Sequence, residues 1–151
     1  MIEPKRAGPP PGPRTGRASG PRATYPRRFF ALLVDGIVLS LVSEAVMRLL
    51  GEEGGSVLAA LLSAYYLVVL IGGPRGQTLG CLLFQIRVVS RDGGGPVGYG
   101  HALVRWLVSI VSGSLLLLGY VWAFFDRERQ TWQDKAAGTI VVPVRYYPIR
   151  R

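Results

Sequence analysis

The sequence predicts an all-α membrane protein, a small multi-pass helical bundle that also carries a short cytoplasmic interfacial helix and small β-strand elements. Apolar residues make up 49% of the 151 residues. They are gathered in about three long blocks, which is typical of a multi-pass membrane protein. A connection with a β-branched run separates the second block from the third. We expect a transmembrane domain over residues 25–144, a disordered cytoplasmic tail over 1–24 and a short basic end over 145–151.

The composition argues against several classes of protein. The net charge of +9 would indicate nucleic-acid binding in a soluble protein, but the basic residues lie beside apolar blocks, where such charge sets membrane orientation. The single cysteine, Cys81, and the single histidine, His101, exclude an internal disulfide and a zinc cluster of several His and Cys ligands. The sequence holds no hydrolase or metalloprotease motif. We therefore predict no enzyme activity, no cofactor, no metal and no nucleic-acid partner.

The first 24 residues are predicted to be a disordered Pro/Gly/Arg-rich tail. They contain six of the eleven prolines, four glycines and five basic residues, and they show no apolar periodicity. Their basic character favours contact with anionic headgroups of the cytoplasmic leaflet.

The first apolar block predicts a membrane-spanning helix over about residues 29–50. It supplies the ~20 apolar residues that a crossing needs and carries one early acid, Asp35. A carboxylate inside the membrane costs about 2.5–3.5 kcal/mol on insertion scales, so it usually has a partner or a use. Arg28 lies seven residues earlier on nearly the same helix face. Arg28 is therefore a candidate partner of Asp35, directly or through a water.

A short acidic turn over residues 51–55 leads into the second span, predicted over 56–71. Glu44 and Arg48, four residues apart near the end of the first helix, are expected to pair with each other. Basic residues number seven in 1–28 and four in 72–105, but none in the acidic turn. The N-terminus and the 72–105 connection are therefore expected to be cytoplasmic and the turn external.

The connection contains two predicted elements. Residues 81–84 form an apolar patch that is too short to span, and we expect a short amphipathic helix lying flat at the membrane interface. Residues 86–89 are β-branched and indicate a strand, which a turn at 92–96 follows.

The third apolar block, about residues 101–125, leaves two topologies open. Its length suits one crossing, which would place the tail outside, but residues 126–151 carry six basic residues, which argues for the inside. Ser-Gly-Ser at 112–114 could split the block into a re-entrant hairpin, tolerated only where protein buries its backbone. A predicted strand over 139–144 has 86–89 as its natural partner, and the two pair only on one side of the membrane. This pairing favours a cytoplasmic C-terminus.

Four blocks of the sequence resemble the RDD family of bacterial membrane proteins. In chain order they are Arg28-Phe29-x-Ala31-x-x-x-Asp35; Gly76-Gln77-Thr78-Leu79-Gly80 with the strand at 86–89; Arg105-Trp106; and residues 122–139, which include Gln133-Asp134-Lys135. The resemblance covers about residues 26–144. It implies a multi-pass protein of the bacterial cytoplasmic membrane.

The family's name refers to one arginine and two aspartates, which the resemblance places at Arg28, Asp35 and Asp134. This chain has Gln133 where the family often has His. The difference puts in doubt any mechanism that needs an imidazole beside Asp134 to carry protons. The resemblance implies transport of an unidentified ligand, with cation–proton exchange in some members.

Five residues are predicted to form an ion pathway or a charged cluster: Arg28, Asp35, Arg105, Asp126 and Asp134. Asp35 is either a carboxylate on a proton or cation pathway or a member of a structural ion pair. Asp126 and Asp134 either join an arginine in a cytoplasmic cluster or occupy helix ends, where an acid suits the helix dipole. The resemblance favours a specific pairing of Asp134 with an arginine.

Two functions of different classes stay open. The one we favour is a small transporter or transporter subunit for an ion or small solute. Three segments are few for a pathway, so this version predicts a homo-oligomer, with close helix approach at Gly113 and Gly119. The other is a non-transporting membrane module that binds a membrane-protein partner or organises lipid, with the Arg/Asp pairs purely structural. Both place the chain in the bacterial inner membrane with a cytoplasmic N-terminus.

Overall fold

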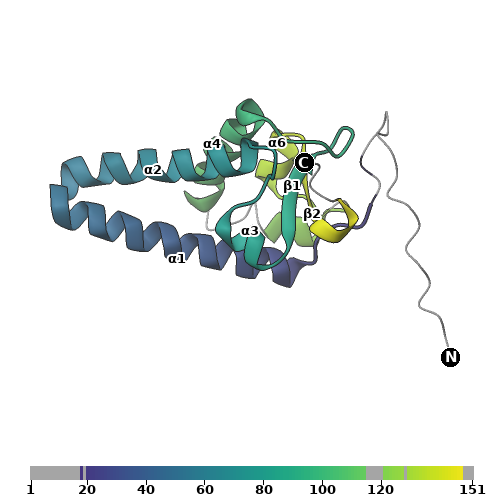
Figure 1. The fold of residues 1–151 in the computed structure, drawn as a ribbon, viewed down its shortest axis with the longest axis horizontal. Helices are drawn as coiled ribbons and strands as arrows, with labels where there is room; N and C mark the ends of the chain where they lie inside the picture. The colour runs from purple at the N-terminus through teal and green to yellow at the C-terminus, as the bar shows by residue number, and fades with distance from the viewer. Residues whose placement is uncertain (1–17, 19, 115–120, 128, 148–151) are drawn as a thin grey trace.

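The fold is described from a computed structural model over residues 18, 20–114, 121–127 and 129–147 (Figure 1). The elements in chain order are α1 (Tyr25–Leu50), α2 (Glu52–Gly72), α3 (Leu79–Leu83), β1 (Ile86–Ser90), α4 (Tyr99–Ser114), the 3-10 helix η1 (Trp122–Phe124), α6 (Trp132–Ala136), β2 (Thr139–Pro143) and the 3-10 helix η2 (Val144–Tyr146). Helices α1 and α2 form a long hairpin that projects from the other elements (Figure 1).

Within the described residues, α1 and α2 are long and apolar enough to cross a membrane. Their outer faces carry large apolar side chains, and Leu41, Leu49 and Leu61 are each more than half exposed. An apolar surface this extensive is unfavourable in water but is expected for helices in contact with lipid. The two predicted spans are therefore present as helices.

The predicted acidic turn over 51–55 is wrong in length. Gly51 alone separates the two helices, and its φ of +79° is a conformation that suits glycine. Glu52 and Glu53 lie in the first turn of α2, where negative charge stabilises a helix N-terminus. The pairing predicted for Glu44 is confirmed, because Arg48 Nε donates to Glu44 Oε1 at 2.8 Å.

The predicted pairing of the two short strands is confirmed. β1 and β2 are antiparallel, with Val88 opposite Val141 and Val89 opposite Ile140. Since successive side chains point to opposite faces of a sheet, the first pair lies on one face and the second pair on the other. Both faces are buried.

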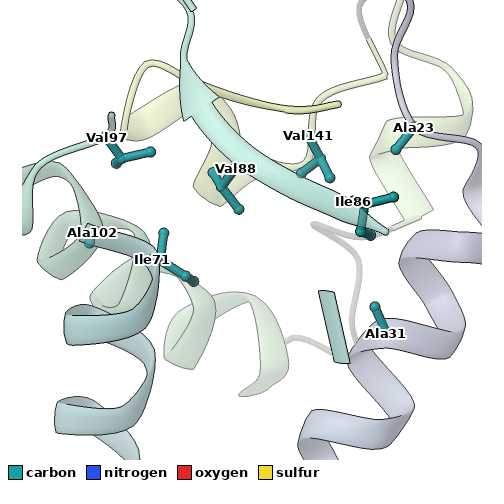
Figure 2. Close-up of a cluster of buried hydrophobic side chains, with 8 residues drawn as sticks. All are labelled: Ala23, Ala31, Ile71, Ile86, Val88, Val97, Ala102 and Val141. Carbon is teal, nitrogen blue, oxygen red and sulfur yellow. The ribbon is translucent and has the colours of Figure 1, made fainter. Parts of the chain in front are cut away.

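One face of this sheet packs against the helices (Figure 2). In Figure 2, Val88 and Ile86 of β1 face Ile71 near the end of α2 and Ala31 on α1. α3 approaches α1 closely here. A Cβ added to Gly80 would lie only 2.0 Å from the Ala31 carbonyl oxygen. The contact requires a residue without a side chain at position 80.

Residues that precede α1 pack against the sheet, which corrects the predicted tail over 1–24. Ala18 is buried on the other face, in a cluster with Val89, Ile140 and Val142. Ala23 belongs to the cluster on the helix-facing side, and its amide donates to the Val141 carbonyl oxygen at 2.9 Å. Residues 18 and 20–24 therefore belong to the folded domain, while residues 1–17 and 19 lie outside the described part of the chain.

The third apolar block does not form one straight helix in the described residues. α4 has 16 residues and ends at Ser114, and residues 115–120 lie outside the description. α4 begins beside the end of α2, where a Cβ on Gly72 would meet Tyr99. After the block, Phe124 stacks on Tyr25 at the start of α1, with ring centroids 4.5 Å apart. The block thus leaves from and returns to the same end of the α1–α2 hairpin, as the re-entrant alternative requires.

The contact at Gly80 yields a test of the packing. Gly80→Ala is expected to lower the free energy of unfolding by about 1–3 kcal/mol, because the added methyl group overlaps the Ala31 carbonyl and forces α3 away from α1. Gly36→Ala on α1 is the control, since its methyl group would meet nothing within 4 Å and alanine favours a helix. Thermal unfolding in detergent compares the two variants. Equal stability of both would contradict the close contact.

Candidate functional site

The most buried charge in the described residues is the carboxylate of Asp134, whose side chain is 0% exposed. Asp134 is the third residue of α6, and it forms a capping box with Thr131. Thr131 Oγ1 accepts from the Asp134 amide at 3.4 Å, and Asp134 Oδ2 accepts from the Thr131 amide at 3.1 Å. Such a reciprocal pair satisfies two backbone donors at the helix start. Asp134 therefore occupies a helix end, as one of the two predicted alternatives requires.

The arginine pairing of Asp134 is present as well, and it involves two arginines. Arg28 of α1 donates to Asp134 Oδ2, and Arg105 of α4 donates to Oδ1. Arg105 also donates to Thr139 Oγ1 at 3.3 Å, and Arg28 donates to the Arg129 carbonyl oxygen. Charge-assisted bonds of this kind are stronger than neutral ones. One carboxylate thus joins α1, α4 and α6.

Asp35 makes different contacts from those predicted, and the direct Arg28–Asp35 pair is wrong. Its Oδ1 accepts from Tyr66 Oη of α2 and from the Gly80 amide, both at 2.8 Å, and its Oδ2 accepts from Thr78 Oγ1 at 2.5 Å. Arg28 and Asp35 share a face of α1, but about 10 Å of helix axis separates them. Three nearer donors from α2 and the start of α3 therefore hold Asp35.

Both hydroxyl groups that hold Asp35 are themselves held by α3. Tyr66 Oη accepts from the Leu79 amide at 2.9 Å, and Thr78 Oγ1 accepts from the Cys81 amide at 3.2 Å. The Asp35 carboxylate thus lies beside the N-terminus of α3, where it accepts a hydrogen bond from the N-cap residue Thr78. This network connects α1, α2 and α3 at one point.

Asp126 contacts the segment between η1 and α6, and α6 itself. Its Oδ2 accepts from the Gln130 amide at 2.9 Å, and its Oδ1 forms an ion pair with Lys135 Nζ at 2.5 Å. These contacts fix the loop between η1 and α6. The structure therefore brings together Arg28, Arg105 and Asp134, and it places Asp35 and Asp126 in separate networks.

Two residues of these networks, and Gln133 beside Asp134, were not singled out as site residues from the sequence. Nothing in the sequence links Tyr66 to Asp35, 31 residues away. Thr78 carries a usable signal, since a threonine before a short apolar helix is a common N-cap. Gln133 is 1% exposed, and none of the described residues donates a hydrogen bond to its Oε1. A buried acceptor in this state costs about 1–3 kcal/mol unless something else supplies the donor.

A cavity of about 450 Å³ lies between the helices and the sheet. Apolar side chains of α1, α2, β1 and α4 form most of its wall. Its polar lining residues are Arg28, Asp35, Thr78, Arg105, Ser109, Thr131 and Gln133. The volume falls within the ~300–1,000 Å³ typical of small-molecule sites. Five residues of the two carboxylate networks therefore line one space: Arg28, Asp35, Thr78, Arg105 and Thr131.

The single thiol of the chain also lies on the cavity wall. Cys81 lines the cavity from α3, and burial raises the pKa of its thiol. A thiol with a raised pKa is mostly protonated near neutral pH and is a poor nucleophile. Cys81 therefore acts here as a small packing residue.

The sequence model of the RDD family matches residues 22–138, which is more than half of the chain. This chain belongs to the RDD family. The RDD assignment from the four sequence blocks is confirmed, and with it the assignment to membrane proteins. The matched range begins within the segment before α1 that covers the sheet.

Mycobacterial proteins are among the relatives of this RDD chain. The "Proline-rich antigen" of Mycobacterium leprae is 32% identical over 89 residues, which cover 57% of this chain and 36% of that protein. A "Proline-rich antigen homolog" of Mycobacterium tuberculosis is 32% identical over 72 residues, covering 48% of this chain and 30% of that protein. The aligned part spans about a third of the length of these curated relatives. No solved structure matches this chain.

The Asp134 cluster predicts a large loss of stability when its carboxylate is neutralised. Asp134→Asn leaves two inward-facing arginines without their shared anion, and we expect the free energy of unfolding to fall by about 3–5 kcal/mol. Glu44→Gln is the control, because it breaks an exposed pair worth at most about 0.5 kcal/mol. Thermal unfolding in detergent measures both. Similar losses in the two variants would show that the cluster does not hold the fold.

Proposed function

We propose that this RDD protein is a small transporter or transporter subunit for an ion or small solute, with the cavity between α1, α2 and α4 as its binding site. The observation that carries the proposal is the lining of that cavity. Three of the five charged residues singled out in the sequence, Arg28, Asp35 and Arg105, face it from two helices. Ionisable groups on an enclosed space inside membrane helices are typical of substrate and ion pathways.

The version that carries a small solute draws more support from the contacts than the version that carries a bare cation. Both buried carboxylates are occupied by protein donors: Asp35 by three neutral groups, and Asp134 by two arginines. A bare cation would have to displace these donors. A solute in the cavity would leave them in place.

We further propose a multi-pass arrangement in the bacterial inner membrane, with the N-terminus in the cytoplasm. The support is the distribution of basic residues, dense before α1 and between α2 and α4 but absent from the α1–α2 turn. A second copy of the chain completes the pathway in this proposal, because two long helices and the shorter α4 enclose little space alone. Gly113 lies in open space, where a Cβ would meet nothing within 4 Å. Gly119 lies outside the described residues.

The contacts of Asp35 favour a second candidate function. Three donors from α2 and the α3 start surround its carboxylate, as expected if its role is purely structural. In that case the chain is a non-transporting membrane module that binds a membrane-protein partner or organises lipid. This candidate predicts no ion flux in the intact protein.

The proposal is tested by proton, Na⁺ and K⁺ flux in proteoliposomes. Leu39→Phe fills part of the cavity from α1 without replacing a charged residue, and we expect it to lose most of the wild-type flux. Leu33→Phe is the matched control, since Leu33 lies on the same helix but is exposed and outside the cavity lining. Gel filtration in detergent checks the folding of both. An absence of ion flux in the wild type, or equal flux in all three proteins, would contradict the version of the proposal in which the protein carries an ion.

A further inference from the structure

A separate pocket of about 440 Å³ lies at the surface, outside the cavity between the helices. Three segments form it: the end of β1, the loop between η1 and α6, and α6 itself. We call it the basic pocket, and its lining residues are Arg91, Phe125, Asp126, Arg127, Gln130 and Lys135. Its volume is in the range of small-molecule sites.

Hydrogen bonds fix the wall of the basic pocket in place. The Arg91 amide donates to the Gly138 carbonyl oxygen at 2.8 Å, which holds the end of β1 against the turn after α6. Gln130 is 2% exposed, and its Nε2 donates to the Thr139 carbonyl oxygen at 2.8 Å. The Gln130 amide in turn donates to Asp126 Oδ2 at 2.9 Å. The loop after η1 is therefore attached to β2, and the pocket is formed before any ligand arrives.

The lining carries an excess of positive charge. Three basic residues contribute to it, Arg91, Arg127 and Lys135. Among the described residues of the lining, Asp126 is the one acid. Glu128 follows Arg127 in the sequence and lies outside the described residues, and its charge would still leave an excess of one positive charge. An anion is therefore the ligand that this pocket favours.

The basic groups are also within reach of a ligand. Arg127 is exposed, and the side chain of Lys135 is 42% exposed. Lys135 Nζ pairs with Asp126 Oδ1 at 2.5 Å, and an ammonium group has three donors, so this pair leaves capacity for a second acceptor. Guanidinium and ammonium groups are the donors that proteins use for phosphate oxygens. A phosphate group fits this donor set.

The pocket adjoins the end of a membrane-spanning helix. Phe124 stacks on Tyr25, the first residue of α1, and the Arg129 guanidinium lies 5.2 Å from the centre of the same tyrosine ring. Phe125, on the pocket wall, is 82% exposed. Exposed aromatic side chains beside basic residues at the end of a span are typical of the level of the lipid headgroups. A soluble phosphate compound would leave Phe125 in water, whereas a phospholipid covers it.

We propose that the basic pocket binds the phosphate of an anionic glycerophospholipid. Arg127 and Lys135 donate to the phosphate oxygens, Arg91 adds positive charge behind them, and Phe125 lies against the glycerol and the first part of the acyl chains. Both oxygens of Asp126 already accept from Lys135 and the Gln130 amide, so the cation of a zwitterionic lipid finds no open carboxylate among the described lining residues. This site goes beyond the proposed function, since it lies outside the cavity and requires no transport.

The test measures lipid binding by the thermal stability of the purified full chain in micelles of a neutral detergent. A ligand that binds the folded state raises the unfolding temperature. We expect phosphatidylglycerol to raise it saturably, and phosphatidylcholine with the same acyl chains to have little effect at equal mole fraction. Arg127→Gln should raise the half-saturating mole fraction of phosphatidylglycerol about fivefold, as expected for one basic residue at an anionic lipid.

A matched variant separates a defined site from diffuse attraction. Arg27→Gln removes the same charge near the start of α1, and Arg27 is exposed and outside the pocket lining. We expect less than a twofold change for this variant. Equal changes for Arg27→Gln and Arg127→Gln, or an absence of saturable stabilisation by phosphatidylglycerol in the wild type, would overturn the assignment.

Glycerol 3-phosphate distinguishes a lipid from a soluble phosphate compound. It carries the same phosphate and glycerol without acyl chains, and we expect it to leave the unfolding temperature unchanged at millimolar concentration. Saturable stabilisation by glycerol 3-phosphate that Arg127→Gln weakens would assign the pocket to a soluble ligand and remove the lipid. Either outcome leaves the transport proposal to its own test, because Leu39 lies in the cavity and not in the basic pocket.

Discussion

The fold depends on the burial of a single carboxylate. Asp134 is fully enclosed, and an ionised group in such a place is tolerated only when charged partners and hydrogen bonds surround it. Arg28, Arg105 and the capping box with Thr131 supply them. Since these groups come from α1, α4 and α6, the cost of burying one charge fixes three segments that lie far apart in the sequence.

Asp35 provides a second point of attachment on α1. There the donors come from Tyr66 of α2, Thr78 and the Gly80 amide, so α1 is held at two levels by different partners. The cavity extends along α1 past both levels. Arg28, Asp35 and Asp134 therefore hold the helices together, and Arg28 and Asp35 also line the cavity that is open to a ligand.

Much of this fold could be predicted from the sequence, because hydropathy, charge and strand patterns are local. The two long helices, the short helix after Thr78 and the pairing of β1 with β2 follow from such patterns. The partner of Asp35 does not, since helical periodicity shows that Arg28 faces the same side but not that nearer donors exist. The burial of Ala18 and Ala23 could not be predicted from local composition, because their partners are strands at residues 86–90 and 139–143.

Arg28 and Asp134 act as one unit in this fold. A double-mutant cycle tests this most directly, with Arg28→Gln, Asp134→Asn and the double variant each measured by thermal unfolding in the same detergent. We predict a coupling of about 1.5–3 kcal/mol, with the double variant far less destabilised than the sum of the single changes. Additive losses, within about 0.5 kcal/mol, would show that the two residues are independent and would contradict this account.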